Sequence, residues 1–134
     1  MQLKIAFFLA LSVCLSSCET TAPTAENLAK VAQIPPNYKD QTVAYFKRTL
    51  KDPYSIRDAQ ITDPTVIFVG LVNGTSAPGV CVQMNGKNSF GAYTGIQFYA
   101  VAFKNGALFG VAPPVFDTCT KAVWRPLPEL NGNG

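Results

Sequence analysis

The chain has 134 residues, with 11 basic and 8 acidic side chains, a formal net charge of +3 and no histidine. This length suits one domain rather than two, and the missing histidine removes the commonest general base and the commonest metal ligand. Because the charge is nearly balanced and spread without runs, we expect no nucleic-acid partner. With no histidine, and with the cysteines of the mature chain expected to be oxidised, we also expect no metal site, and we expect no cofactor.

The first 17 residues have the pattern of an export signal. Lys4 and the amino terminus supply positive charge, and residues 5–14 are an uncharged apolar run, too short to span a bilayer. Two small residues, Ser16 and Ser17, then precede Cys18. The alternatives are an ordinary signal peptide with a chance cysteine, or a buried apolar helix.

The Leu15-Ser16-Ser17-Cys18 motif resembles the lipobox of bacterial lipoproteins. The resemblance implies that a signal peptide of residues 1–17 is removed and that Cys18 becomes the acylated first residue, palmitate being a typical acyl chain. Cys14 is a poorer acceptor because the bulky Val13 precedes it. Since Glu19, not Asp, follows Cys18, the expected place in a two-membrane bacterium is the outer membrane, facing the periplasm. More than one acyl chain makes such anchoring stable.

Residues 18–36 are rich in Thr and Ala and are expected to form a flexible tether, in which residues 25–33 can form a transient helix. A single domain is then expected over residues 37–134. It opens with a helix that Asn37 caps and that ends before Pro53. The helix carries an apolar stripe of Val43, Phe46 and Leu50. Its last turns carry Lys47, Arg48 and Lys51, either as a complement to the helix dipole or as a patch for lipid headgroups.

After the helix the pattern changes to that of strands, with β-branched and aromatic residues between turn signals. Asn105-Gly106 is typical of a type I′ hairpin turn, and residues 127–134 are expected to be a loose tail. The predicted strands cover residues 54–61, 65–72, 79–85, 96–104 and 107–112, with a last extended piece over 116–124. The aromatic residues expected in the core are Phe68, Phe98, Phe103, Phe109 and Trp124.

The predicted fold class is α+β: one N-terminal amphipathic helix packed on a four- to five-stranded antiparallel sheet, with one disulfide. After Cys18 only Cys81 and Cys119 remain, and two cysteines in an oxidising compartment most simply pair. Closing a loop of this length contributes roughly 3–4 kcal/mol to stability in the chain-entropy model. The alternative is two free thiols or a redox pair, for which a CxxC spacing is missing.

Residues 85–95 (NGKNSFGAYTG) join two predicted strands and are longer than the usual hairpin link. Extra length with aromatic and polar groups is typical of a binding loop. The candidate binding residues are Lys87, Asn88, Ser89, Phe90 and Tyr93. The alternative is a structural loop, in which Asn and Gly make turns and the two rings cover the sheet.

A larger resemblance covers residues 43–98. The residues Val80-Cys81, Asn85, 87–91 (KNSFG) and 93–95 (YTG), with Asp52-Pro53-Tyr54-Ser55 upstream, resemble a segment of small uncharacterised exported proteobacterial proteins. That family has glycine where this chain has Val82 and Ala92. The resemblance implies an exported single domain without an assigned activity, so it assigns no catalytic residue.

The expected function is that of a non-enzymatic interaction or structural module, anchored to the membrane by its lipid and docking an envelope protein or the cell wall. One alternative is an inhibitor or small-ligand-binding lipoprotein, similar to periplasmic lysozyme inhibitors, although a basic chain lacks the charge complement of a basic lysozyme. Another is a hydrolase that uses Ser89 with Lys87 or Asp117 as its base, which no motif supports.

Overall fold

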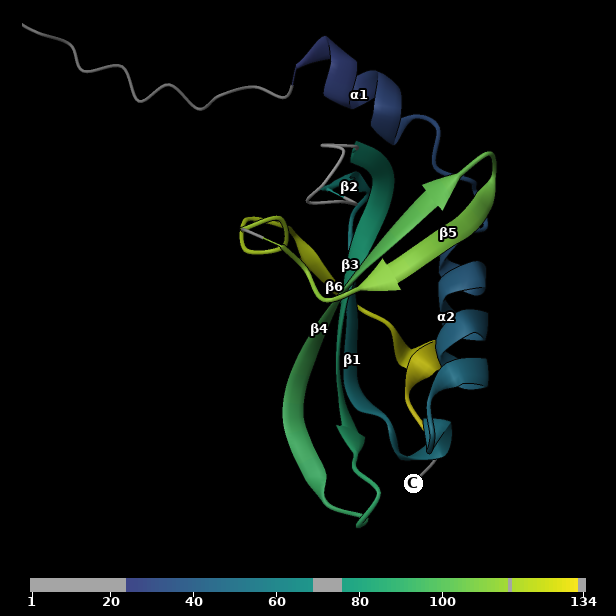
Figure 1. Ribbon diagram of the computed structural model, residues 1–134, viewed down its shortest axis with the longest axis vertical. Coiled ribbons are helices and arrows are strands. Elements are labelled where there is room, and N and C mark those ends of the chain that lie inside the picture. The colour runs from purple at the N-terminus through teal and green to yellow at the C-terminus, as the bar shows by residue number, and fades with distance from the viewer. Residues whose placement is uncertain (1–23, 69–75, 116, 133–134) are drawn as a thin grey trace, which may run out of the picture.

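In the computed structural model, the residues described are 24–68, 76–115 and 117–132. Over these ranges the chain forms two α-helices and one antiparallel sheet of six strands. The expected α+β class is therefore confirmed, with one helix more than predicted and six strands in place of four or five. Helix α2 (Tyr38–Thr49) runs beside the sheet, and α1 (Ala25–Val31) lies at one end of it (Figure 1). The strands are β1 (Arg57–Thr62), β2 (Thr65–Phe68), β3 (Ser76–Lys87), β4 (Tyr93–Lys104), β5 (Ala107–Ala112) and β6 (Trp124–Pro126).

The sheet is built around the long β3–β4 hairpin. Its order is β5-β4-β3-β1-β6, and β2 pairs with the end of β3 that β1 leaves open. Gly79 lies where β3 is flanked by β2 and β4, and a Cβ atom there would come within 2.2 Å of the Val101 carbonyl oxygen. Only glycine therefore lets these three strands approach so closely.

Helix α2 packs its predicted stripe on the sheet. Phe46 is buried, with its ring 5.1 Å from that of Tyr99, and Val43 and Leu50 pack around the same core. Asn37 makes no side-chain cap bond to the backbone. Its side-chain oxygen instead accepts from the side-chain amide of Gln41. The Gln41 side chain also donates to the Gly106 carbonyl and accepts from the Leu108 amide, and so links the helix to the β4–β5 turn.

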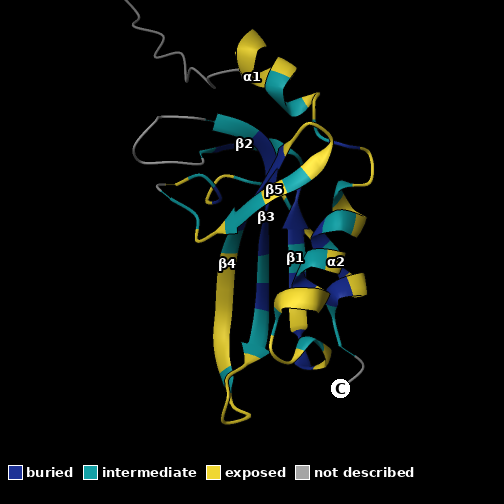
Figure 2. Cartoon of the chain, turned by 45° about the vertical axis from the view of Figure 1, so that its right-hand side comes forward, coloured by how far each residue is buried: buried dark blue, intermediate teal, exposed yellow. Residues whose placement is uncertain are grey.

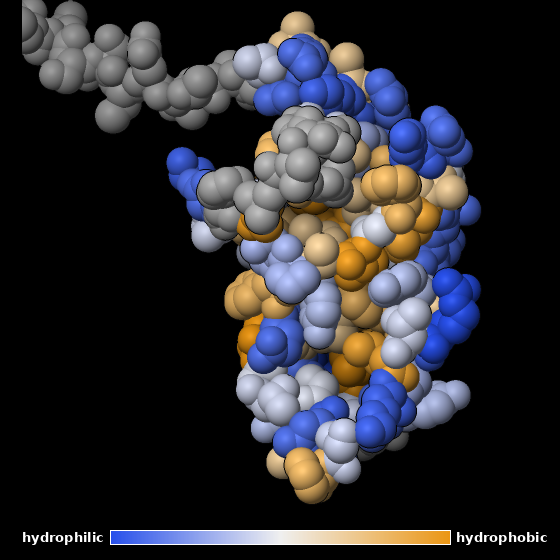
Figure 3. Space-filling view, viewed as in Figure 1, coloured by the Kyte–Doolittle hydropathy of each residue, from blue (hydrophilic) through white to orange (hydrophobic). Residues whose placement is uncertain are grey.

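The Asn105-Gly106 turn forms as predicted, since both residues have positive φ, 52° and 78°. The core, however, is mostly aliphatic, and Figure 2 shows that it lies between α2 and the middle of the sheet. Of the five aromatic residues expected there, only Phe103 is buried. Phe98 and Phe109 lie largely in solvent, because they sit on the face opposite α2 or on the edge strand, and Figure 3 shows hydrophobic surface at several places on one face. Trp124 and Phe68 are half-buried.

Part of the face opposite α2 is covered by the segment that carries Cys119. Cys119 forms the predicted disulfide with Cys81 of β3, with the two Cα atoms 5.8 Å apart. Both cysteines are buried against Ile67, Ala100 and Ala102. The disulfide therefore links the turn that contains Cys119 to β3, on the face of the sheet opposite α2.

The prediction of a loose tail over 127–134 is wrong for residues 127–132. Leu127 and Leu130 are 1% and 0% exposed and belong to the main core. The Leu127 amide donates to the Ala59 carbonyl at 2.9 Å, and the Gly132 amide donates to the Ile56 carbonyl at 2.7 Å. The tail is ordered because it closes the outer side of β1, beyond β6.

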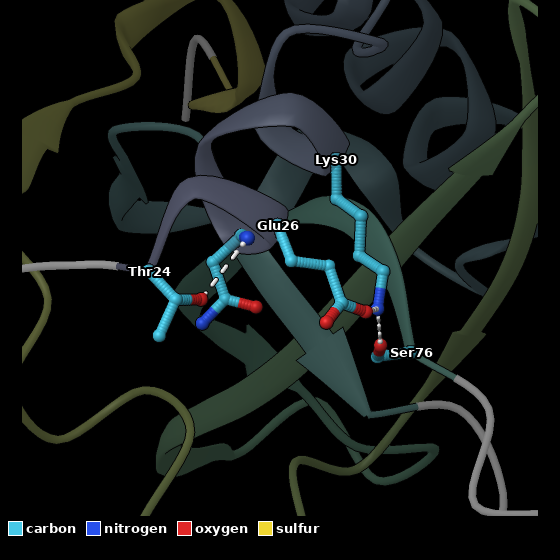
Figure 4. Close-up of polar contacts among 5 residues, drawn as sticks. Thr24, Glu26, Lys30 and Ser76 are labelled. Carbon is cyan, nitrogen blue, oxygen red and sulfur yellow. Dashed lines mark hydrogen bonds and ion pairs between the residues drawn. The ribbon is translucent and has the colours of Figure 1, made fainter.

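The expected tether is partly folded. Thr24 caps α1 by accepting from the Asn27 amide, and the Lys30 ammonium bonds both Glu26 and Ser76 of β3 at 2.8 Å (Figure 4). Residues 25–31 are thus a helix that contacts the sheet rather than a flexible coil. The predicted signal peptide, Cys18 and the predicted strand positions 69–72 lie outside the described residues.

Candidate interaction surface

The candidate binding residues lie at the tip of the β3–β4 hairpin, at the opposite end of the molecule from α1 (Figure 1). The link that the sequence suggested over 85–95 is mostly strand: β3 continues to Lys87 and β4 begins at Tyr93. The connecting loop is therefore residues 88–92, an ordinary hairpin length. Its length alone does not mark it as a binding loop.

Asn88 organises this loop. Its side-chain oxygen accepts from the amides of Phe90 at 2.9 Å and Ala92 at 3.1 Å, and its backbone amide donates to the Ala92 carbonyl at 2.8 Å. Gly91 has φ of 80°, a conformation that favours glycine. The result is a built turn that holds the Phe90 side chain 95% exposed.

Ser89 ties the loop to the end of α2. The Lys51 ammonium donates to the Ser89 hydroxyl at 2.8 Å, across 38 positions of sequence. Sequence reasoning assigned Lys51 to the helix dipole or to lipid headgroups and did not find this contact. The hydrolase hypothesis needed Lys87 or Asp117 beside Ser89, but the structure brings neither into a hydrogen bond with it and places Asp117 in the segment next to Cys119.

The ring of Tyr93 lies close to two cations. The guanidinium carbon of Arg57 lies 3.2 Å from the centre of the Tyr93 ring, and the Lys87 ammonium nitrogen lies 5.3 Å from it. The strand β1 reaches this position through an irregularity, because its register with β3 shifts after Arg57 and Asp58 has φ of 58°. Such contacts contribute about 0.5–1 kcal/mol each at exposed sites, so Tyr93 acts mainly in the scaffold.

This end of the molecule carries cations without carboxylate partners. Within the described residues, the ion pairs are Glu26–Lys30 and Asp63–Arg125, and no carboxylate oxygen lies within 4.0 Å of the charged groups of Lys51, Arg57 or Lys87. The Asp63–Arg125 pair is bidentate, because two guanidinium nitrogens of Arg125 donate to the two carboxylate oxygens of Asp63. The hydrogen bonding from Arg125 lowers the pKa of Asp63. The hairpin end therefore carries three cations that form no ion pair, with Asp52 and Asp58 beside them in the sequence, and the exposed ring of Phe90.

A second feature lies on β4. The strand β5 pairs with β4 only from Ala100 onward, so the outer edge of residues 93–99 has no strand partner among the described residues. Figure 2 shows this half of β4 as exposed, whereas β3 beside it is half-buried to buried. Ile96 and Phe98 are 40% and 46% exposed there.

A pocket of about 400 Å³ adjoins this open edge. Phe98 and Trp124 form its aromatic wall, with ring centres 6.0 Å apart. Its other lining residues are Gln83, Pro114, Cys119 and Thr120. None of these is charged, so the pocket suits an apolar group.

The described residues offer neither a cluster of metal-binding side chains nor a helix that could cross a membrane. No three His, Cys, Asp or Glu side chains of residues 24–68, 76–115 and 117–132 gather in a way that would hold a metal ion. Neither α1 nor α2 has the length and apolar character needed to cross a bilayer.

Comparison of the chain with protein-family models, with curated proteins and with solved structures yields no match. Any function must therefore be argued from the residues and contacts described above.

Proposed function

We propose that this protein is a lipid-anchored docking module of the bacterial cell envelope, attached through Cys18 and binding an envelope partner with its hairpin tip. The observation that carries the proposal is the exposure of Phe90 on a turn that four Asn88 hydrogen bonds hold in shape. An exposed large apolar ring on a preorganised turn has the character of an interface anchor. Preorganisation also lowers the entropy lost on binding.

The position of the tip supports this role. The helix α1 lies at one end of the molecule and the hairpin tip at the other (Figure 1). A lipid at Cys18 would precede α1 by only a few residues, so the membrane would lie on the α1 side. The tip would then point away from the membrane, toward the periplasm or the cell wall.

The charge at the tip indicates the chemistry of the partner. Lys51, Arg57 and Lys87 are exposed and lack carboxylate partners among the described residues. An anionic surface on the partner would complement them and speed association. The same charge disfavours the alternative of a lysozyme inhibitor, because lysozymes are themselves basic.

The test is crosslinking in living cells of the tagged full-length protein, comparing Phe90→Ala with Phe109→Ala. Phe109 is a matched control, since it is also exposed (59%) but lies on β5, away from the tip. We expect one envelope partner to crosslink to the wild type and to Phe109→Ala, and at least tenfold less to Phe90→Ala. Equal crosslinking by Phe90→Ala, or no partner at all, would refute docking through the tip.

The pocket beside Phe98 favours a second candidate function, the binding of a small apolar ligand. Trp124 lines this pocket and is the one tryptophan of the chain, so its fluorescence reports occupancy. Titration with a panel of fatty acids and small aromatic compounds would shift the emission if this function holds. An unchanged spectrum across the panel would count against it.

A further inference from the structure

The open part of β4 is an unprotected sheet edge. Proteins usually block such edges with lysine, proline, a bulge or a covering segment, because an open edge recruits other strands. Residues 96–99 (IQFY) contain no charge and no proline. A bulge around Gly95, with φ of 92°, limits the edge on one side, and the start of β5 limits it on the other.

The β5 edge shows the contrast. There the side-chain oxygen of Gln41 in α2 accepts from the Leu108 amide at 2.8 Å. This hydrogen bond satisfies one backbone N–H group at the outer edge of β5. No corresponding contact is made with the backbone of Ile96 or Phe98 by any described residue. The opening on β4 is thus a local feature and not a general property of this sheet.

The ladder determines which backbone groups point outward. The Cys81 amide donates to the Thr62 hydroxyl on the β1 side, so Cys81 faces away from β4. Its partner Ala100 must then face β5, and because an antiparallel ladder alternates, Ile96 and Phe98 face the same side. Both residues therefore offer an N–H and a C=O group at the open edge.

The side chains beside this edge form a receptor for apolar groups. Phe98 shares the sheet face of Ala100, and it contacts Trp124 at the rim of the pocket of about 400 Å³. Side chains of an added strand that point to this face would lie over Ile96 and Phe98. Beyond the bulge, the edge continues toward Tyr93 with its two cations, Arg57 and Lys87.

A second copy of the chain is a poor occupant. Two identical edges pair most simply as antiparallel strands about a two-fold axis. The open half of β4 lies along the long axis of the molecule, between the hairpin tip and the part of the strand that β5 covers (Figure 1). Such a dimer would direct its two α1 ends in opposite directions, whereas two lipid anchors must enter one membrane. This argument rests on the proposed function.

We infer that residues 96–99 of β4 bind an extended segment of an envelope partner by strand addition, and that this segment carries apolar side chains toward Phe98 and carboxylates beside Lys87 and Arg57. Main-chain hydrogen bonds from Ile96 and Phe98 supply affinity, and the pocket and cations supply selectivity. This strand addition rests on the proposed docking function, and it specifies which kind of segment of the envelope partner is bound.

The experiment uses the full-length protein in lipid nanodiscs and a displayed library of random ten-residue peptides. The best binder is then tested by hydrogen exchange of the Ile96 and Phe98 amides. Two variants separate backbone from side chain: Ile96→Pro removes the outward N–H group, whereas Ile96→Ala keeps it and loses a similar apolar contact. Circular dichroism checks that both fold, and Phe98→Lys, which places a charge on the same edge, replaces Ile96→Pro if that variant does not.

Strand addition predicts enrichment of peptides with alternating apolar residues and a terminal pair of acids. It also predicts slower exchange of both amides by at least tenfold, and at least tenfold weaker binding to Ile96→Pro with less than threefold loss in Ile96→Ala. No enrichment, or equal binding by Ile96→Pro and Ile96→Ala, overturns the inference. Protection that rises with protein concentration in the absence of peptide assigns the edge to a second copy and also overturns it.

The two proposals fail separately. If the cellular crosslink is lost in Phe90→Ala but kept in Ile96→Pro, the tip docks its partner and strand addition is wrong. If the peptide binds and protects β4 while no cellular crosslink depends on Phe90, the edge is a binding site and docking through the tip is wrong.

Discussion

The five candidate residues of the hairpin divide into different roles once their contacts are known. Asn88 shapes the turn, Ser89 anchors it to Lys51, and Tyr93 packs against the cations of Arg57 and Lys87, while Phe90 faces solvent. Lys87 is exposed and is one of the three cations at the hairpin end. A binding role at residue scale therefore falls on Phe90 and Lys87, and the other three residues hold them in place.

The role of Asn88 leads to a prediction. In Asn88→Ala the amides of Phe90 and Ala92 lose their acceptor, so each should exchange hydrogen about five- to tenfold faster, which corresponds to roughly 1 kcal/mol per bond. Asn88→Asp keeps the acceptor oxygen and should exchange as the wild type does. Equal exchange in all three proteins would show that the turn does not depend on this side chain.

Asp63 gives a prediction about pH. Its pKa is lowered from the ordinary value of 3.8 by the hydrogen bond from Arg125, so the carboxylate contributes stability above its unfolded-state pKa and loses that contribution as the pH falls through the folded-state pKa. Thermal unfolding should show Asp63→Asn less stable than wild type at neutral pH, with the difference shrinking below about pH 4. Asp117, an exposed carboxylate, provides the control variant Asp117→Asn, and a constant difference for Asp63→Asn at all pH values would contradict the assignment.

At the scale of elements, the C-terminal segment is part of the core. The 3-10 helix over Pro128–Leu130 inserts Leu130 beside Phe46 and Ile61, and Gly132 packs where a Cβ atom would overlap the Tyr54 carbonyl. This segment closes the side of the sheet beyond β1. On the other side of the hairpin, β5 covers β4 only from Ala100 onward, and no other described strand pairs with residues 93–99 there, so this half of β4 is the open edge.

We expect Leu130→Ala to lower the free energy of unfolding by about 2–5 kcal/mol, because it leaves a cavity in a fully buried site. Glu129→Ala, an exposed change in the same turn, should stay within about 0.5 kcal/mol of wild type. Urea denaturation monitored by circular dichroism measures both. A Leu130→Ala variant as stable as Glu129→Ala would mean that the tail is not part of the cooperative core.

At the scale of the whole molecule, the long axis separates the α1 end from the tip (Figure 1). Strand register sets this arrangement, because the twelve-residue strands β3 and β4 extend beyond the region that β5 covers. A molecule with a proposed anchor at one end and an exposed tip at the other is suited to reaching across a gap. That suitability depends on acylation of Cys18.

The anchoring proposal predicts that Cys18→Ser moves the protein from the membrane fraction to the soluble fraction of the cell, whereas Cys14→Ser leaves it in the membrane fraction. Metabolic labelling with a fatty acid analogue should mark the wild type and Cys14→Ser but not Cys18→Ser. Unchanged fractionation of Cys18→Ser would rule out the lipid anchor.

Several features followed from local sequence alone. The stripe of Val43, Phe46 and Leu50 predicted α2, alternation with β-branched residues predicted the central strands, and Asn105-Gly106 predicted the last hairpin turn. These three predictions are confirmed because the spacing of apolar residues in a helix or strand, and the conformation of a turn, depend on residues only a few positions apart. The disulfide also followed, since only two cysteines remained to pair.

Contacts between distant segments were decided by tertiary structure. Arg57 meets Tyr93 and Lys51 meets Ser89 only because β1 and the end of α2 lie beside the hairpin, and no local pattern encodes that register. Likewise residues 127–132 were expected to be a loose tail because two leucines alone show no periodicity, yet Leu127 and Leu130 pack into the main core beside β1. The sequence thus determined which segments become helix, strand and turn, while packing decided which side chains remain exposed to meet a partner. The physical reason is that exposure depends on strand order and on what covers each edge, and both are properties of the assembled sheet.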